Sequence, residues 1–131
     1  NKPVETLSAP PAYWEAVHES MRAVVHSARG TARKIGEGIR YEMASKTGTS
    51  QVIGIAQNAI YVEADVAERH RNHGLFIAFA PYEAPTIAVA VIVENGGGAS
   101  AASPIARAVL DAWLVDDPEP VDGVAEEQTD G

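Results

Sequence analysis

Cysteine is absent from the 131-residue sequence. Thiol catalysis and disulfide bonds are therefore excluded for this chain, and the absence fits any cellular compartment. Long hydrophobic runs are missing as well, since no stretch approaches the roughly 20 apolar residues that a membrane-spanning helix needs. The first residues, Asn-Lys-Pro-Val-Glu-Thr-Leu-Ser-Ala-Pro-Pro, do not have the pattern of a signal peptide. We expect them to be the interior of a longer protein.

Basic residues are few. Ten Lys and Arg residues stand against eighteen Asp and Glu, for a formal net charge of −8. Seven of the acids lie in residues 116–131 without a base, so residues 1–115 hold eleven acids and ten bases. No basic stripe is present, and no nucleic-acid partner is expected. We interpret residues 1–115 as part of a folded domain and residues 116–131 as an acidic disordered tail.

One stretch, residues 41–52, gathers groups suited to anion binding: Tyr-Glu-Met-Ala-Ser-Lys-Thr-Gly-Thr-Ser-Gln-Val. In a strand, Lys46 and Gly48 share one face while Thr47 and Thr49 share the other. Gly48 leaves the surface beside the lysine open to a substrate backbone. A cation, two hydroxyls and open N–H groups suit a carboxylate, or an oxyanion that forms during acyl transfer. An ordinary edge strand with one solvated lysine would have the same local sequence pattern. The flanking sequence is therefore needed to distinguish a binding strand from an ordinary one.

Three strands and two helices are predicted around this stretch. The first helix runs from about Pro11 to Ala28, and the second starts with Ser103 as N-cap and Pro104 at the first position. The strands cover residues 39–53, 75–80 and 86–94.

The last two strands are continuous apolar runs, which is typical of strands covered on both faces. Their five-residue connection predicts an antiparallel hairpin. Helices above and below then give an α/β (α+β) three-layer sandwich whose sheet is largely antiparallel.

Residues 54–72 form a polar insertion, helix-compatible from Ala56 to Arg71. Such a segment is either a solvated face or the rim of a cleft; we favour the rim narrowly and assign it no chemistry. His18 and His26 lie eight residues apart on the first helix without a third ligand, so we expect structural roles and no metal. The glycines at 96–98 lack a phosphate-loop lysine, and no nucleotide is expected.

Lys-Thr-Gly is one of the catalytic boxes of serine β-lactamases and penicillin-binding proteins. Here it is followed by His-Gly-Leu-Phe-Ile-Ala-Phe-Ala-Pro at 73–81 and by Ile-Ala-Val-Ala-Val-Ile-Val-Glu-Asn-Gly-Gly-Gly at 87–98. From Trp14 to Leu114 the sequence resembles the C-terminal part of a penicillin-binding transpeptidase domain, in the class B, penicillin-binding protein 2 group of elongation type. The resemblance implies the β-lactamase/transpeptidase-like fold, here its C-terminal antiparallel strands with two flanking helices.

The resemblance also implies roles for four residues. Lys46 would act electrostatically in the proton relay and attract the substrate carboxylate. Thr47 and Thr49 would supply hydroxyls to that carboxylate, and the Thr49 N–H would form half of the oxyanion hole. Gly48 would permit close approach, and no cofactor is required. Ser45 stands where relatives often have glycine, which leaves its packing open.

A Gly-Thr-Ala segment at residues 30–32 similarly links a helix to the active-site strand in the family resembled, and is expected to shape the edge of the cleft. Two other boxes of the family, Ser-x-x-Lys with the nucleophile and Ser-x-Asn, do not occur in the 131 residues. We therefore expect this chain alone to be inactive, with the nucleophile and a membrane anchor upstream. Three strands and two helices would also leave apolar surface open, so the segment should be stable only with its upstream partner.

The complete protein would then be a D,D-transpeptidase at the periplasmic face of the bacterial inner membrane. It would act on D-Ala-D-Ala stem peptides, be acylated by β-lactams and work with a membrane glycosyltransferase. A D,D-carboxypeptidase or β-lactamase relative would share the box but use water as acceptor. A non-catalytic sensor that binds β-lactam or peptide is the third reading, and would carry several receptor-type helices upstream.

Overall fold

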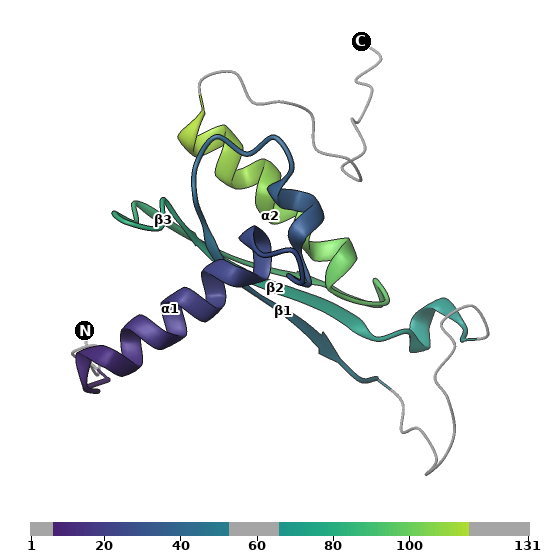
Figure 1. Cartoon of the computed structure of the whole chain (residues 1–131). Coiled ribbons are helices and arrows are strands. Elements are labelled where there is room, and N and C mark those ends of the chain that lie inside the picture. Colours follow the sequence, from purple (N-terminus) through teal and green to yellow (C-terminus); the bar gives the residue numbers. More distant parts are fainter. Residues whose placement is uncertain (1–6, 53–65, 116–131) are drawn as a thin grey trace, which may run out of the picture.

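The computed structural model describes residues 7–52 and 66–115. Its elements, in chain order, are α1 (Pro11–His26), the 3-10 helix η1 (Arg33–Gly36), β1 (Ala44–Ser50), the 3-10 helix η3 (Glu68–His70), β2 (His73–Ala80), β3 (Ile87–Val93) and α2 (Ala99–Leu114) (Figure 1). None of the described helices is long and apolar enough to cross a membrane.

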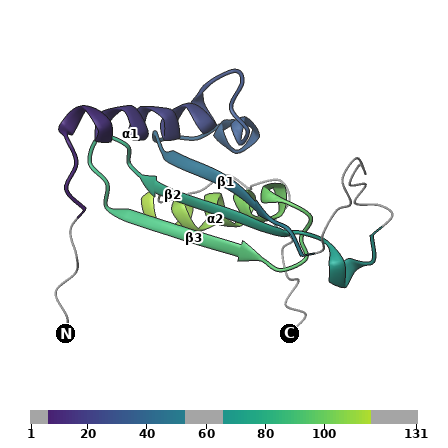
Figure 2. The ribbon, with the colours of Figure 1, turned by 90° about the horizontal axis from the view of Figure 1, so that it is seen from below.

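The three strands form one antiparallel sheet in the order β1-β2-β3. Figure 2 shows α1 running along the β1 side of the sheet, with α2 behind the sheet. In agreement, α1 packs against β1, and α2 packs against β2 and β3. The predicted hairpin, the antiparallel sheet and the two flanking helices are confirmed.

The strand register divides the sheet into two faces. Thr47 pairs with Phe76, which belongs to the buried core beneath α2, whereas Lys46 pairs with Ile77 on the opposite side. Because cross-strand partners point the same way and neighbours along a strand point opposite ways, the face toward α2 also carries Thr49. The face toward α1 also carries Gly48.

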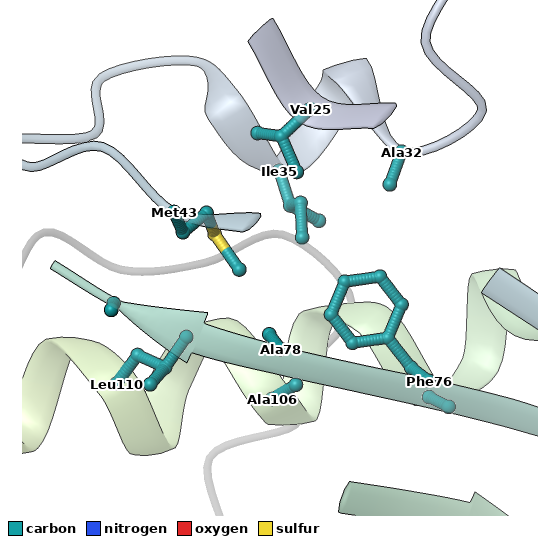
Figure 3. Packing of buried hydrophobic residues seen from close by; sticks show 10 residues of the cluster. Val25, Ala32, Ile35, Met43, Phe76, Ala78, Ala106 and Leu110 are labelled. Carbon is teal, nitrogen blue, oxygen red and sulfur yellow. The ribbon is translucent and has the colours of Figure 1, made fainter. Parts of the chain in front are cut away.

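The core lies on the face toward α2. Phe76 reaches from β2 toward Ile35 (Figure 3), and Leu110 of α2 is fully buried on the same side of the sheet. Two alanines of α2, Ala102 and Ala106, are also fully buried, and their small side chains let the helix approach the sheet closely. The end of α1 and the η1 segment close this core along the β1 edge, through Val25, Ala32, Ile35 and Met43.

The opposite face is covered only in part by the described residues. The ring of His18 on α1 lies 5.2 Å from that of Phe79, but Ile77 is 49% exposed and Ile92 is 67% exposed. Within the described residues, the cover predicted for this face of β2 and β3 is therefore incomplete, in line with the expectation that three strands and two helices leave apolar surface open. Since α1 packs along β1, no described element shields the outer side of β3.

Element boundaries differ from the prediction at α2 and at β1. The predicted start at Ser103 is wrong, because Gly98 is the N-cap and Pro104 lies inside the helix. Packing of Ala102 and Ala106 against the sheet outweighs the single backbone hydrogen bond that an early proline removes.

The first strand is shorter than predicted, starting at Ala44 rather than at residue 39, and α1 ends at His26. Most of the 54–72 insertion, with its predicted helix, lies outside the described residues, as does the predicted tail at 116–131.

Candidate functional site

Strand β1, which carries Lys46 to Thr49, lies at the edge of the sheet. Among residues 7–52 and 66–115, no strand pairs with its outer side. An edge strand presents a row of backbone N–H and C=O groups that can pair with another extended chain. The structure therefore places the predicted box where an extended peptide could be added to the sheet.

Lys46 is exposed on the face toward α1. It lines a groove of about 430 Å³ with Val17, Ser20, Met21 and their neighbours on that helix. Its Nζ donates a hydrogen bond of 2.6 Å to the Thr47 carbonyl. No carboxylate of the described chain forms an ion pair with this amine, so its charge is available to an anion.

Thr47 faces the other way. Its hydroxyl lies 3.0 Å from that of Thr31, and both residues line a cavity of about 250 Å³ together with Ser103 and the start of α2. The predicted alternation of faces is confirmed by the register. Because the lysine and the threonine hydroxyls lie on opposite sides of β1, a ligand that contacts both must lie along the strand edge.

Two glycines lie at close contacts around the box. A Cβ on Gly48 would lie 3.2 Å from the Cβ of Leu75, so a larger residue here would require Leu75 to shift by a few tenths of an ångström. A Cβ on Gly74, the partner of Thr49, would lie 2.1 Å from the Gly98 carbonyl. Gly74 thus lets the start of α2 come up to the strand pair beside Thr49.

The roles of Gly74 and Thr31 were not predicted in this form. The sequence shows Gly74 only as part of the His-Gly pattern. Gly98, against which it packs, lies far along the chain, and no local pattern links the two glycines. The Gly-Thr-Ala segment at 30–32 was expected at the cleft edge, and the structure adds the specific contact of its hydroxyl with Thr47.

The chain entering β1 is anchored to α1 by two polar contacts. Arg22 binds both carboxylate oxygens of Glu42, with Nε 2.9 Å from Oε2, and these hydrogen bonds lower the pKa of Glu42. The Met43 N–H donates to His26 Nε2 at 3.1 Å, and burial lowers the pKa of His26. The contacts of His26 are structural, as predicted, and they fix where the box begins.

Ser45 is fully buried, and its hydroxyl has no hydrogen-bond partner among the described residues. It pairs with Ala78 on the face toward α2. A serine at this position therefore brings a polar atom into an apolar layer, which is a cost that glycine or alanine would avoid. Within residues 7–52 and 66–115, no group of three or more His, Asp or Glu side chains could hold a metal ion.

An edge strand with the Lys-Thr-Gly-Thr box, in an antiparallel sheet flanked by helices, defines a portion of the fold shared by serine β-lactamases and penicillin-binding proteins. The sequence matches the family described as the penicillin binding protein transpeptidase domain over residues 1–111. The chain belongs to this family, within the penicillin-binding protein 2 (MrdA) group.

Three relatives illustrate the match. The peptidoglycan D,D-transpeptidase MrdA of Escherichia coli K12 is 42% identical over 105 residues, which cover 80% of this chain and 17% of that protein. The crystal structure of Pseudomonas aeruginosa PBP2 in complex with WCK 5153 is 41% identical, with a TM-score of 0.68, over 90% of this chain and 23% of that one. Helicobacter pylori PBP2, in its complex with MreC, is 33% identical with a TM-score of 0.55, over 66% and 14% of the two chains. The present chain thus spans less than a quarter of the length of these relatives.

Proposed function

We propose that this chain is the C-terminal part of the catalytic domain of a peptidoglycan D,D-transpeptidase, an enzyme that cross-links stem peptides through a serine acyl-enzyme. The observation that carries the proposal is the edge strand β1, which presents Lys46, Thr47 and Thr49 beside unpaired backbone groups. The identity with MrdA transpeptidases supports it.

In this proposal the acyl donor lies extended along the outer edge of β1. The ammonium of Lys46 on one side and the hydroxyls of Thr47 and Thr49 on the other attract the terminal carboxylate of D-Ala-D-Ala. Charge-assisted hydrogen bonds of this kind are stronger than neutral ones. The carboxylate is thereby fixed, and the scissile carbonyl comes to a defined position along the strand.

A serine outside this chain then attacks that carbonyl, and the terminal D-alanine leaves. The Thr49 N–H stabilises the oxyanion that forms during this attack. An amine of a neighbouring stem peptide next attacks the acyl-enzyme and releases the cross-linked product. A β-lactam would acylate the same serine.

The location and partners are part of the same proposal. We place the whole protein at the periplasmic face of the bacterial inner membrane, together with a membrane glycosyltransferase that supplies glycan strands. The complex of the Helicobacter pylori relative with MreC supports the view that such proteins work in assemblies. A carboxypeptidase, a β-lactamase relative or a sensor domain would share the box, and the transfer of the acyl group to an amine rather than to water distinguishes the transpeptidase.

The proposal is tested by acylation of the full-length protein with a labelled penicillin, followed as a second-order rate. Replacing Lys46 by methionine should lower this rate by about 100-fold or more, because the charge that attracts the carboxylate and a group of the proton relay are both lost. Arg29→Met is the matched control, because Arg29 is another exposed cation and lies outside β1. An unchanged rate in the Lys46 variant would contradict the proposed role. The absence of any labelling of the wild type would contradict the function.

A further inference from the structure

A buried ion pair lies on α2, away from the edge strand. The Nε of Arg107 lies 2.7 Å from each carboxylate oxygen of Asp111, one helical turn further on. Arg107 is 5% exposed and Asp111 is 2% exposed. A buried pair of charges gives up hydration and is often no more stabilising than an apolar pair of similar size, so stability alone does not account for it.

The same two side chains hold the connection between α1 and β1. Arg107 Nη1 donates to the Ile35 carbonyl and, at 3.3 Å, to the Glu37 carbonyl. The Tyr41 hydroxyl donates to Asp111 Oδ1 at 2.7 Å. In Figure 1 this connection, drawn in dark blue, lies beside α2 before it enters the sheet. The planar guanidinium spreads five N–H donors over a fixed fork and so reaches a carboxylate and two carbonyls, whereas a lysine has three donors on a single nitrogen.

This connection also carries the residue that touches the box. Thr31, at its beginning, is exposed, so burial does not fix its position. Its hydroxyl nevertheless lies 3.0 Å from the Thr47 hydroxyl. Its neighbour Ala32 is buried and donates its N–H to the Val24 carbonyl of α1 at 3.0 Å. The η1 helix, whose Ile35 is buried in the core, then leads on to the carbonyls bound by Arg107. The position of Thr31 is therefore set on one side by α1, through Ala32, and on the other side by α2, through η1.

We propose that Arg107 is a positioning residue, which holds the connection between residues 31 and 37 so that Thr31 orients the Thr47 hydroxyl toward a carboxylate at the edge of β1. The inference rests on the proposed function, because it assumes that this hydroxyl recognises the carboxylate of the substrate or of penicillin. It predicts that Arg107 affects the recognition of the carboxylate more than the reactivity of the serine.

The test uses the full-length protein and two probes, benzylpenicillin and its methyl ester, which lacks the free carboxylate. In the double variant Arg107→Met with Asp111→Leu, both charges are removed together, so neither is left buried and unpaired. We expect about a tenfold fall in the second-order acylation rate with benzylpenicillin and an unchanged rate with the ester. The melting temperature checks that both proteins are folded.

Thr31→Val provides a second route, because it removes the exposed hydroxyl and leaves the ion pair intact. It should show the same loss of preference for the free acid, and adding it to the double variant should cause no further loss. An equal fall with both probes, or an unchanged preference in Thr31→Val, would overturn the positioning role, even if the double variant failed to fold. A wild type that neither probe acylates would instead refute the proposed function on which the inference rests.

Discussion

The two faces of the sheet differ in how completely they are packed. On the face toward α2, Phe76 is 1% exposed and lies among alanines of the helix. On the face toward α1, its neighbour Ile77 is 49% exposed, and Ile92 is 67% exposed. The strand β2 thus contributes buried residues to the core on one face and exposed apolar residues on the other.

The open face is also the one that carries Lys46 and Gly48. A large exposed apolar patch usually marks a surface that another segment or protein covers. Under the proposed function, we expect a further part of the transpeptidase domain to pack on this face and to bring the nucleophile toward Lys46. The closed face toward α2, in contrast, packs the sheet against the core and so supports the strand that carries the box.

The largest effect is expected on the closed face. Phe76→Ala should destabilise the full-length protein by about 3–5 kcal/mol, because the buried ring leaves a cavity between β2, α2 and η1. Urea unfolding measures the change in the free energy of unfolding. A loss below about 1 kcal/mol would show that this core is not the one that supports the domain.

A somewhat smaller loss should follow Ile77→Ala. In the full-length protein, where we expect the open face to be covered, the substitution should cost about 2–4 kcal/mol, which lies within the range for truncating a buried isoleucine to alanine. If Ile77 remained half exposed, the substitution would lower the free energy of unfolding by much less. Equal, small effects of Ile77→Ala in the full-length protein and at an exposed control, Val109→Ala, would contradict the covered face.

The anchor of β1 to α1 predicts a pH dependence. Because burial lowers the pKa of His26 below the ordinary value of about 6.5, the unfolded chain binds the extra proton first. The stability that neutral His26 contributes is complete above about pH 6.5 and declines as the pH falls toward the lowered pKa. His26→Gln keeps an acceptor for the Met43 N–H without titrating.

Melting temperatures at about pH 8 and pH 5.5 bracket this window. The wild type should lose more stability than His26→Gln on acidification, and His18→Gln, on the same helix, should behave like the wild type. Identical pH profiles for the wild type and His26→Gln would show that the Met43 contact does not depend on a neutral imidazole.

The smallest effect is expected at Ser45. Its buried hydroxyl has no partner among the described residues, so Ser45→Ala should raise the free energy of unfolding by about 1 kcal/mol. Chemical denaturation measures it, with Ser50→Ala on the same strand as an exposed control. A clear loss of stability in Ser45→Ala would show that the hydroxyl is bonded to another part of the protein.

The sequence predicted the elements whose patterns are local. The hairpin of β2 and β3 followed from two apolar runs and a short connection, and the alternation of Lys46 and Thr47 followed from the two-residue period of a strand. The start of α2 was wrong, because a Ser-Pro pair has the pattern of an N-terminus, whereas contacts with the sheet extend the helix back to Ala99.

Long-range contacts account for what could not be predicted. The bonds from Arg107 to the Ile35 and Glu37 carbonyls join residues about seventy positions apart, and Gly74 is needed only because Gly98 folds back against it. The face toward α1 was predicted to be covered because an apolar run predicts a buried strand. Such a run does not show which part of the protein packs against the strand.

The most direct test of the account is to locate the penicillin adduct by intact mass and peptide mapping. The full-length protein and the 131-residue segment are incubated separately with the labelled compound. We predict one adduct per full-length protein, on a serine outside residues 1–131, and none on the isolated segment. An adduct on Ser45, Ser50 or another residue of this segment would contradict the proposal that the chain supplies the binding strand while the nucleophile comes from elsewhere.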